Sequence, residues 1–322
     1  MAKIKKSILK NRTFGHIVAT FFYVVVVYFL FNAASNMNYI WKWTSVPQYF
    51  VYEKITAIEA PFDGIVEIKK NGTVLLSNHE ESIELEIPSN YNITIDSGDE
   101  LFEYDEVAKS SSWAMGPLLK GLLVTIKISG FAAILAFSIG ILLAFMRLSS
   151  YQFLKDIATV YITIIRGTPL LVQIFIFYFI IATIFELERF LAGGLSLGIF
   201  FGAYIAEVLR GAIQSIDKGQ YEAAKSLGMN YFETMAFIIM PQALKRALPT
   251  LVGEMIALVK DSSLVSIISI TDLTKVGREI VANTFSPFET WIIIAGMYFC
   301  ITALLAYIGG RWEKKMATSG GM

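Results

Sequence analysis

The chain has 322 residues, of which 55% are hydrophobic and only 17% are charged, and its mean hydropathy is +0.57. This composition excludes an ordinary soluble domain and indicates an integral membrane protein. The formal net charge is zero and gives no indication of a nucleic-acid partner.

Six stretches are long and apolar enough to cross the roughly 30 Å of a bilayer's hydrocarbon core. They run over about 17–35, 118–146, 157–185, 191–211, 250–270 and 290–310. The first can alternatively be read as a signal peptide, because basic residues precede it and Asn32-Ala33-Ala34-Ser35 ends it. Its apolar run is, however, longer than the roughly 7 to 15 residues usual in a signal peptide, so we interpret it as a transmembrane helix.

Basic residues at the two ends of the chain predict its orientation. They are Lys3, Lys5, Lys6, Lys10 and Arg12 before the first span, and Arg311, Lys314 and Lys315 after the last. Positive residues remain on the cytoplasmic side, so residues 1–16 and 316–322 are expected in the cytoplasm. An even number of spans agrees with this expectation.

The segment 36–116 is then expected outside the cytoplasm, and its 14 acidic residues against five lysines suit that side. It contains short alternating runs at 64–68, 73–76, 83–87 and 91–95, separated by turn signals such as Asp63-Gly64 and Asn71-Gly72. These runs predict a small β-rich domain of about 70 residues. The single cysteine, Cys300, excludes an internal disulfide and indicates no cysteine-based metal site.

The loop at 214–248 is too polar to cross the membrane, yet it is patterned like a helix. Residues 217–228 predict a short helix that Asp217 or its neighbour caps, that carries Ala223, Ala224 and Leu227 on one face, and that ends at Gly228. A second short helix is expected from about Tyr231 to Ile239, before Pro241.

This loop contains Glu222-Ala223-Ala224, followed after three residues by Gly228, after nine more by Ile238, and then by Met240-Pro241. This pattern resembles the EAA loop of bacterial ABC importer permeases. Further motifs resemble the permeases for polar amino acids (histidine, glutamate, glutamine, arginine, opines). They are Arg166-Gly-Thr-Pro-Leu-Leu-Val-Gln173, Tyr204-Ile-Ala-Glu-Val-Leu-Arg-Gly211, Pro241-Gln-Ala243 and Lys260-Asp-Ser-Ser-Leu264. The resemblance covers roughly 117–315.

The resemblance implies an all-α polytopic membrane protein of the bacterial inner membrane. Its five-helix type I permease core would occupy 117–315, with an extra N-terminal transmembrane helix and an inserted extracytoplasmic β domain. The loop would couple the chain to a separate ATPase, present in two copies, through Glu222, Ala223, Ala224, Gly228 and Pro241. Further implied partners are a second permease subunit, identical or paralogous, an extracytoplasmic amino-acid-binding protein, and membrane lipid. The chain would be a transport subunit rather than an enzyme, without a cofactor or metal.

Polar residues inside the predicted spans are candidates for the substrate pathway, because ionisable groups in a bilayer are costly and face a cavity or a partner. These candidates are Arg166, Thr168, Gln173, Glu207, Lys260, Asp261, Ser262 and Ser263. Pro169 is expected to break its helix nearby. The two cations and two anions suit a zwitterion, but they can equally be structural ion pairs, and hydroxyls and amides also link transmembrane helices.

No GxxxxGK[ST] run is present, so a partner would have to hydrolyse ATP. Two other functions remain open. One is a channel or secondary transporter that works without an ATPase. The other is a membrane sensor that uses the outer β domain.

Overall fold

The computed structural model describes residues 12–36, 39–69 and 73–318. The basic residues before Arg12, the predicted turn at Asn71-Gly72 and the tail at 319–322 lie outside the described residues. The chain divides into two compact units, Met1–Trp43 and Thr44–Met322. In the first, α2 (Arg12–Ser35) contains the first predicted span.

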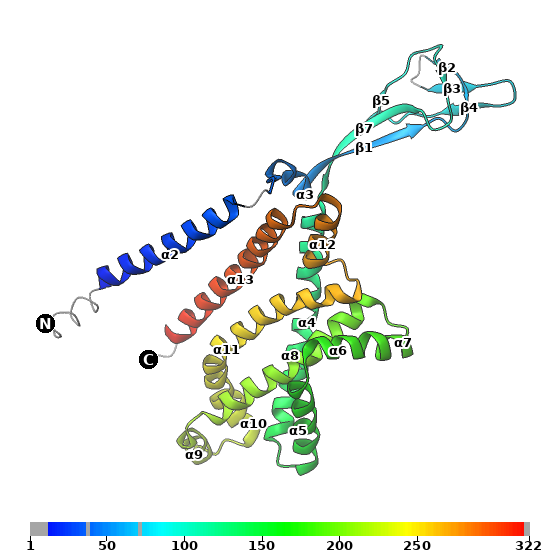
Figure 1. The fold of residues 1–322 in the computed structure, drawn as a ribbon. Helices are drawn as coiled ribbons and strands as arrows, with labels where there is room; N and C mark the ends of the chain where they lie inside the picture. Colours follow the sequence, from blue (N-terminus) through cyan, green and yellow to red (C-terminus); the bar gives the residue numbers. More distant parts are fainter. Residues whose placement is uncertain (1–11, 37–38, 70–72, 319–322) are drawn as a thin grey trace. The chain divides into compact units, whose positions relative to one another are not determined.

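The β-rich part of the second unit consists of two small antiparallel sheets (Figure 1). One has the order β1-β7-β5, formed by Val51–Glu59, Glu106–Met115 and Asn92–Ile93. The other has the order β4-β3-β2-β6, formed by Ser82–Leu85, Val74–Ser77, Gly64–Ile68 and Glu100–Leu101. Val66, Val74, Leu76, Leu101 and Val107 form their common core. Strands at the four predicted runs are confirmed, although β5 is only two residues long.

The two longest strands, β1 and β7, were not predicted. They pair from Val51 with Met115 to Glu59 with Glu106, and most of their side chains are exposed. A strand with both faces exposed needs no alternation of apolar and polar residues, so the sequence carries no clear strand signal there.

The paired strands are fixed to the helical part through α3 (Pro47–Phe50) and Gly116. The Gly116 N–H donates to the Phe50 carbonyl at 2.6 Å. A Cβ atom on Gly116 would lie 2.3 Å from the Tyr49 carbonyl oxygen, so only glycine fits. The Tyr49 side chain packs with Leu118 and Leu273.

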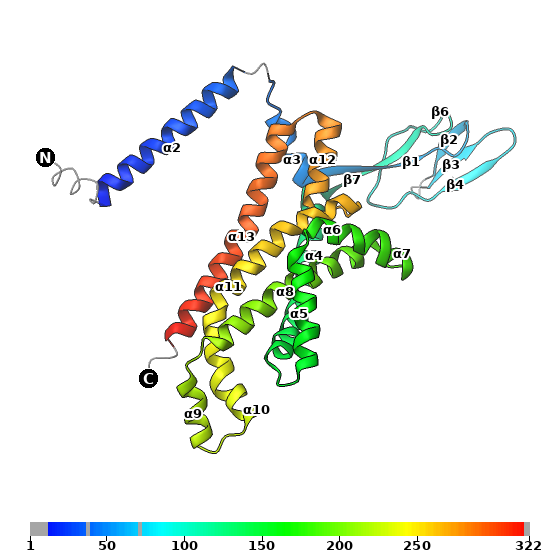
Figure 2. The same ribbon diagram turned by 60° about the horizontal axis from the view of Figure 1, so that its bottom comes forward.

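Helices form the rest of the second unit (Figure 1 and Figure 2). In chain order they are α4 (Pro117–Leu148), α5 (Gln152–Gly167), α6 (Leu170–Ile176), the π-helix η2 (Phe177–Ile181), α7 (Ala182–Ile184), α8 (Arg189–Gln214), α9 (Lys218–Ser226), α10 (Tyr231–Glu233), the π-helix η3 (Thr234–Ile239), α11 (Met240–Asp261), the 3-10 helix η4 (Ser262–Ile268), α12 (Leu273–Thr284) and α13 (Pro287–Thr318). A further short 3-10 helix, η1, covers Trp43–Ser45.

Helices α4 and α8 form the central contact, and glycines allow their close approach. A Cβ atom on Gly140 would lie 2.6 Å from Cγ2 of Ile205, and one on Gly202 would lie 2.8 Å from Cγ2 of Ile139. Small residues at such crossings let the backbones of membrane helices pack closely. Helix α11 packs against both α8 and α13, and α12 packs against α4.

Four helices in the described part of the chain are long and apolar enough to cross a membrane: Phe14–Ser35, Pro117–Leu148, Arg189–Gln214 and Pro287–Met316. The third predicted span, 157–185, is broken, because the segments Gln152–Gly167 and Leu170–Ile184 meet at 108°; together they would make a fifth span. The fifth predicted span, 250–270, coincides with the end of α11 and with η4. Helix α11 is not among the qualifying helices.

Candidate functional site

Helix α9 in the polar loop has a well-defined beginning and end. The Asp217 carboxylate accepts a hydrogen bond from the Gly219 N–H at 2.7 Å, which caps the helix as predicted. Gly228 has a φ of +76°. Its N–H donates to the Lys225 carbonyl at 3.0 Å, and the Met229 N–H donates to the Ala224 carbonyl at 3.1 Å. This pair of bonds is a Schellman motif, so the predicted glycine stop is confirmed.

The expected end of the second loop helix before Pro241 is wrong. Asn230 and Glu233 form a capping box that starts α10, and the chain then stays helical through η3 into α11. Pro241 is the second residue of α11 and directly follows η3, and the helical backbone continues past it.

The predicted coupling residues divide into a buried and an exposed set. Ala224 is 3% exposed, whereas Glu222, Ala223, Gly228 and Pro241 are exposed. The shared face expected for Ala223, Ala224 and Leu227 is therefore wrong: Ala224 packs inward, and Leu227 is 81% exposed. Neighbouring helix positions point about 100° apart, since a turn holds about 3.6 residues, so Ala223 and Ala224 belong to different faces.

Side chains from α11 hold the loop in place. The Gln242 amide donates to the Gln220 side chain at 3.0 Å and to the Ile238 carbonyl at 2.8 Å. Arg246 donates to the carbonyl and, at 3.1 Å, to the hydroxyl of Ser215, where α8 ends. No such role was predicted for Gln220, Gln242 and Arg246, because the contacts of Gln242 with Gln220 and of Arg246 with Ser215 join residues more than 20 positions apart.

Beneath the loop lies a small apolar core of Ile213, Ile216, Met235, Ile239 and Ala243. Tyr221 of α9 packs on this core, and burial, with a contribution from Tyr231, raises the pKa of its hydroxyl. The loop thus forms a packed unit at the end of α8 and the start of α11.

A second cluster surrounds Glu207 of α8, whose carboxylate faces three arginines. Arg210 donates to it through two nitrogens at 2.8 and 3.0 Å, Arg147 lies at 3.6 Å, and Arg166 lies at 3.7 Å. The structure therefore brings Arg166 and Glu207 together, and adds Arg147 and Arg210, which were not candidates. The spacing of Glu207 and Arg210 on one helix was an available signal, whereas Arg147 lies at the very end of its helix.

Arg147, Arg166 and Glu207 border a cavity of about 440 Å³. Thr159, Thr163 and Tyr204 also line it, and the Arg166 guanidinium carbon lies 5.2 Å from the centroid of the Tyr204 ring. The two arginines and one glutamate that line the cavity leave an excess of positive charge there, in place of the balanced set of two cations and two anions that was expected. Such a site can attract a carboxylate.

Thr168 and Gln173 lie together where α5 and α6 meet, at the predicted helix break. The Gln173 side chain is 5% exposed and donates to the Ile165 carbonyl and to the Thr168 hydroxyl, both at 2.7 Å. The Thr168 hydroxyl in turn donates to the Ile164 carbonyl at 2.9 Å. Both predicted residues thus contact backbone.

The remaining four candidates lie apart from the Glu207 cluster. Lys260 and Asp261 end α11, and Ser262 and Ser263 begin η4. Among the described residues, neither Lys260 nor Asp261 has an opposite charge within ion-pair distance. Ser262 is fully buried and donates to the Val259 carbonyl at 2.8 Å.

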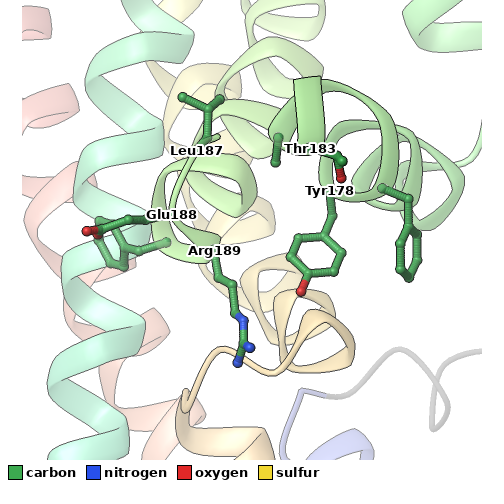
Figure 3. A pocket seen from close by; sticks show the side chains of 8 residues that line it. Tyr178, Thr183, Leu187, Glu188 and Arg189 are labelled. Atoms are coloured by element: carbon green, nitrogen blue, oxygen red, sulfur yellow. The ribbon is translucent and has the colours of Figure 1, made fainter. Parts of the chain in front are cut away.

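A further cavity, of about 700 Å³, lies where α7 meets α8 and was not predicted. Figure 3 shows the polar ends of Tyr178 and Arg189 on the same side of it, with Glu188 turned away. Within the described ranges no group of three histidines, cysteines or acidic residues could hold a metal ion.

Comparisons with known proteins relate most of the helical part to one family. Residues 136–317 match the family described as "Binding-protein-dependent transport system inner membrane component". The "Glutamine transport system permease protein GlnP" of Escherichia coli (strain K12) is 38% identical over 211 residues, 64% of this chain and 96% of that protein. The protein of the same name from Shigella flexneri has the same identity and coverage.

Solved structures agree with this relationship. A crystal structure of an amino acid ABC transporter with histidines has a TM-score of 0.58 and 39% sequence identity, and covers 62% of this chain and 94% of that chain. The MetNI methionine ABC transporter in an inward facing conformation has a TM-score of 0.55 at 17% identity, over 62% of this chain and 96% of that chain. The latter shows a common fold alone.

Proposed function

Because this chain belongs to the family of binding-protein-dependent transport system inner membrane components, we propose that it carries polar amino acids across the inner membrane. It is the permease subunit of an ABC importer, and a separate subunit hydrolyses the ATP. The amino-acid cargo is supported by the name of the Escherichia coli relative, a glutamine permease, and by the solved amino acid transporter with histidines.

Coupling to the ATPase takes place through α9 and the glycine turn that follows it. The observation that carries this proposal is the combination of the hydrogen-bonded turn at Gly228 with apolar side chains beside it that no residue in the described part of the chain covers. Leu227 and Phe232 are each 81% exposed, while Gln242 and Arg246 hold the loop to α11 and α8. Movement of an ATPase bound here would thus be transmitted to both helices, and Glu222, Ala223 and Pro241 would contribute to the same docking surface.

Both ends of the chain lie in the cytoplasm, with the loop at 214–248 on the same side; the basic residues near both termini support this orientation. Helix α2 then acts as a transmembrane helix added to a five-helix core, and the β-rich part lies outside. Two permease subunits, identical or paralogous, two ATPases and an extracytoplasmic binding protein form the working complex, surrounded by lipid.

Within the membrane, the cavity beside Glu207 is the best-supported part of the substrate pathway. Its excess of arginine favours the carboxylate that all amino acids share. Lys260, Asp261 and Ser263 form a second candidate group on the α11–η4 junction. The contacts of Ser262, Thr168 and Gln173 with backbone carbonyls favour structural roles for these three residues.

The test is reconstitution of the permease with its ATPase and binding protein in proteoliposomes, followed by a panel of acidic, amidic, basic and neutral amino acids. Polar amino acids are expected to stimulate ATP hydrolysis and to accumulate inside. Accumulation that persists without the ATPase would instead identify a channel or secondary transporter. Stimulation by none of the amino acids would refute the proposed cargo.

A further inference from the structure

The junction of α5 and α6 contains a backbone carbonyl that the helix itself cannot satisfy. Thr168 and Pro169 are both extended, with ψ of 144° and 137°, so the helix stops at Gly167. Pro169 has no N–H, and therefore cannot donate to the carbonyl of Ile165 four residues earlier. In a membrane, water is not at hand to replace that donor.

The Gln173 side chain occupies the place of the missing donor. Its Nε2 lies 2.7 Å from the Ile165 carbonyl oxygen and 2.7 Å from the Thr168 hydroxyl. Its own backbone N–H donates to the Pro169 carbonyl at 3.2 Å. One residue on α6 is thereby joined to the last turn of α5 and to both residues of the break.

We infer that Gln173 is a positioning residue for transport: its carboxamide replaces the hydrogen bond that Pro169 removes and fixes the angle between α5 and α6. This inference rests on the proposed transport function. It reassigns Gln173 from the substrate pathway, because both hydrogens of its amide are used and its side chain is 5% exposed.

The oxygen of the same amide supports this assignment. Oε1 of Gln173 is buried and has no donor among the described residues. Exchanging the oxygen and nitrogen would place Oε1 against two oxygen acceptors, the carbonyl of Ile165 and the hydroxyl of Thr168. The amide orientation is therefore dictated by the break in the helix rather than by a partner for Oε1.

The angle between α5 and α6 determines how the lining of the cavity beside Glu207 lies relative to the lining of the cavity where α7 meets α8. Arg166, the residue after Ile165, belongs to the Glu207 cluster. Beyond α6 the chain continues through η2 and α7, where Tyr178 and Thr183 line the second cavity. A change of angle at the break would alter the distance between these two sets of side chains, so the bond at Gln173 bears on transport as well as on folding.

Gln173→Leu removes the donor with little change in volume, and Gln173→Glu retains the shape but replaces the NH₂ group by oxygen. Each is expected to lower amino-acid-stimulated ATP hydrolysis about tenfold, because leaving the buried Ile165 carbonyl without a donor lowers the population of the native bend by about that factor. Gln152→Leu, at the exposed start of α5, is the matched control and is expected to leave the rate unchanged.

A double variant separates positioning from stability. Pro169→Ala returns an N–H to position 169 that can donate to the Ile165 carbonyl, so Pro169→Ala combined with Gln173→Leu should recover part of the thermal stability that Gln173→Leu loses. Transport should remain low, because a helical residue 169 changes the angle between α5 and α6. Recovery of transport together with stability would show that Gln173 only stabilises the fold, and normal transport in Gln173→Leu alone would also overturn the inference.

The angle can be measured without any transport assay. Spin labels at Val160 on α5 and Ile184 on α7, both exposed, are introduced in a Cys300→Ser background, since Cys300 is exposed. A single narrow distance distribution is expected in the wild-type background, and a broad or shifted one with Gln173→Leu. Unchanged distributions would refute the positioning role even if the protein's cargo were something other than an amino acid.

Discussion

Gly228 offers the sharpest test of the proposed coupling between the loop at 214–248 and an ATPase. Its φ of +76° lies in the left-handed region, where a residue with a Cβ atom pays a conformational penalty of about 1–2 kcal/mol and a β-branched residue is a clear outlier. A Cβ atom at this position would have no heavy atom within 4 Å. The penalty in the isolated chain is therefore backbone strain alone, without a steric clash.

The series Gly228→Asn, Gly228→Ala and Gly228→Val grades this strain. Asparagine enters the left-handed region more readily than other residues, so it should retain most coupling. Alanine and valine should lower the population of the native turn, and one or two kcal/mol corresponds to a factor of about 5 to 30. The assay is the fraction of ATPase that co-purifies with the permease, together with substrate-stimulated ATP hydrolysis in proteoliposomes.

The matched control is Gly211→Val in α8, where a Cβ atom also has open space but φ is not positive. It should retain coupling. Normal coupling in Gly228→Val would refute the strain argument. Equal loss in Gly228→Asn and Gly228→Val would show that the ATPase needs the space at Gly228, rather than its backbone conformation.

Three further substitutions test other parts of the structure. Glu207→Gln removes the negative charge that contacts three arginines. It should lower the free energy of unfolding by about 1–2 kcal/mol, a modest loss because these groups are partly exposed. A lower melting temperature of the purified complex is expected, and an unchanged melting temperature would contradict the prediction. Gly140→Leu should destabilise by about 1–3 kcal/mol through overpacking against Ile205, while Gly130→Leu on an open face of α4 should be tolerated in the same melting assay. Asp217→Ala should cost α9 about 1 kcal/mol of capping energy and reduce ATPase co-purification, whereas Asp217→Asn, which retains the acceptor, should not.

The features that were predicted well from the sequence are those that residues close together in the chain determine. The apolar runs of α4, α8 and α13 are long enough to identify a helix by themselves. The cap at Asp217, the stop at Gly228 and the break at Pro169 each depend on one residue's own conformational preference, and all three are confirmed. Each concerns residues close in sequence, where propensity alone decides the outcome.

Contacts between distant residues were not predictable in the same way. The recruitment of Arg147 to Glu207 depends on how α4 and α8 pack, and the role of Gln173 depends on which way α6 leaves the break. From the sequence, Pro169 predicts that the Ile165 carbonyl loses its backbone donor. Only the three-dimensional structure identifies the Gln173 side chain as the donor that replaces it. The helix at Pro241 began earlier than expected, because the backbone is already helical in η3 and continues through Pro241 into α11.

The pairing of β1 with β7 has a consequence for how the β-rich part relates to the remainder of the chain. Val51 and Met115 are directly opposite, and the next residue outward on each side, Phe50 and Gly116, share a hydrogen bond. The chain therefore leaves and re-enters the helical part at one point, so the 51–115 segment adds sequence length without separating its two neighbours. The segment is an insertion attached at a single point. A short linker between Phe50 and Gly116 could replace it, and so could any other small fold whose two ends lie on adjacent strands.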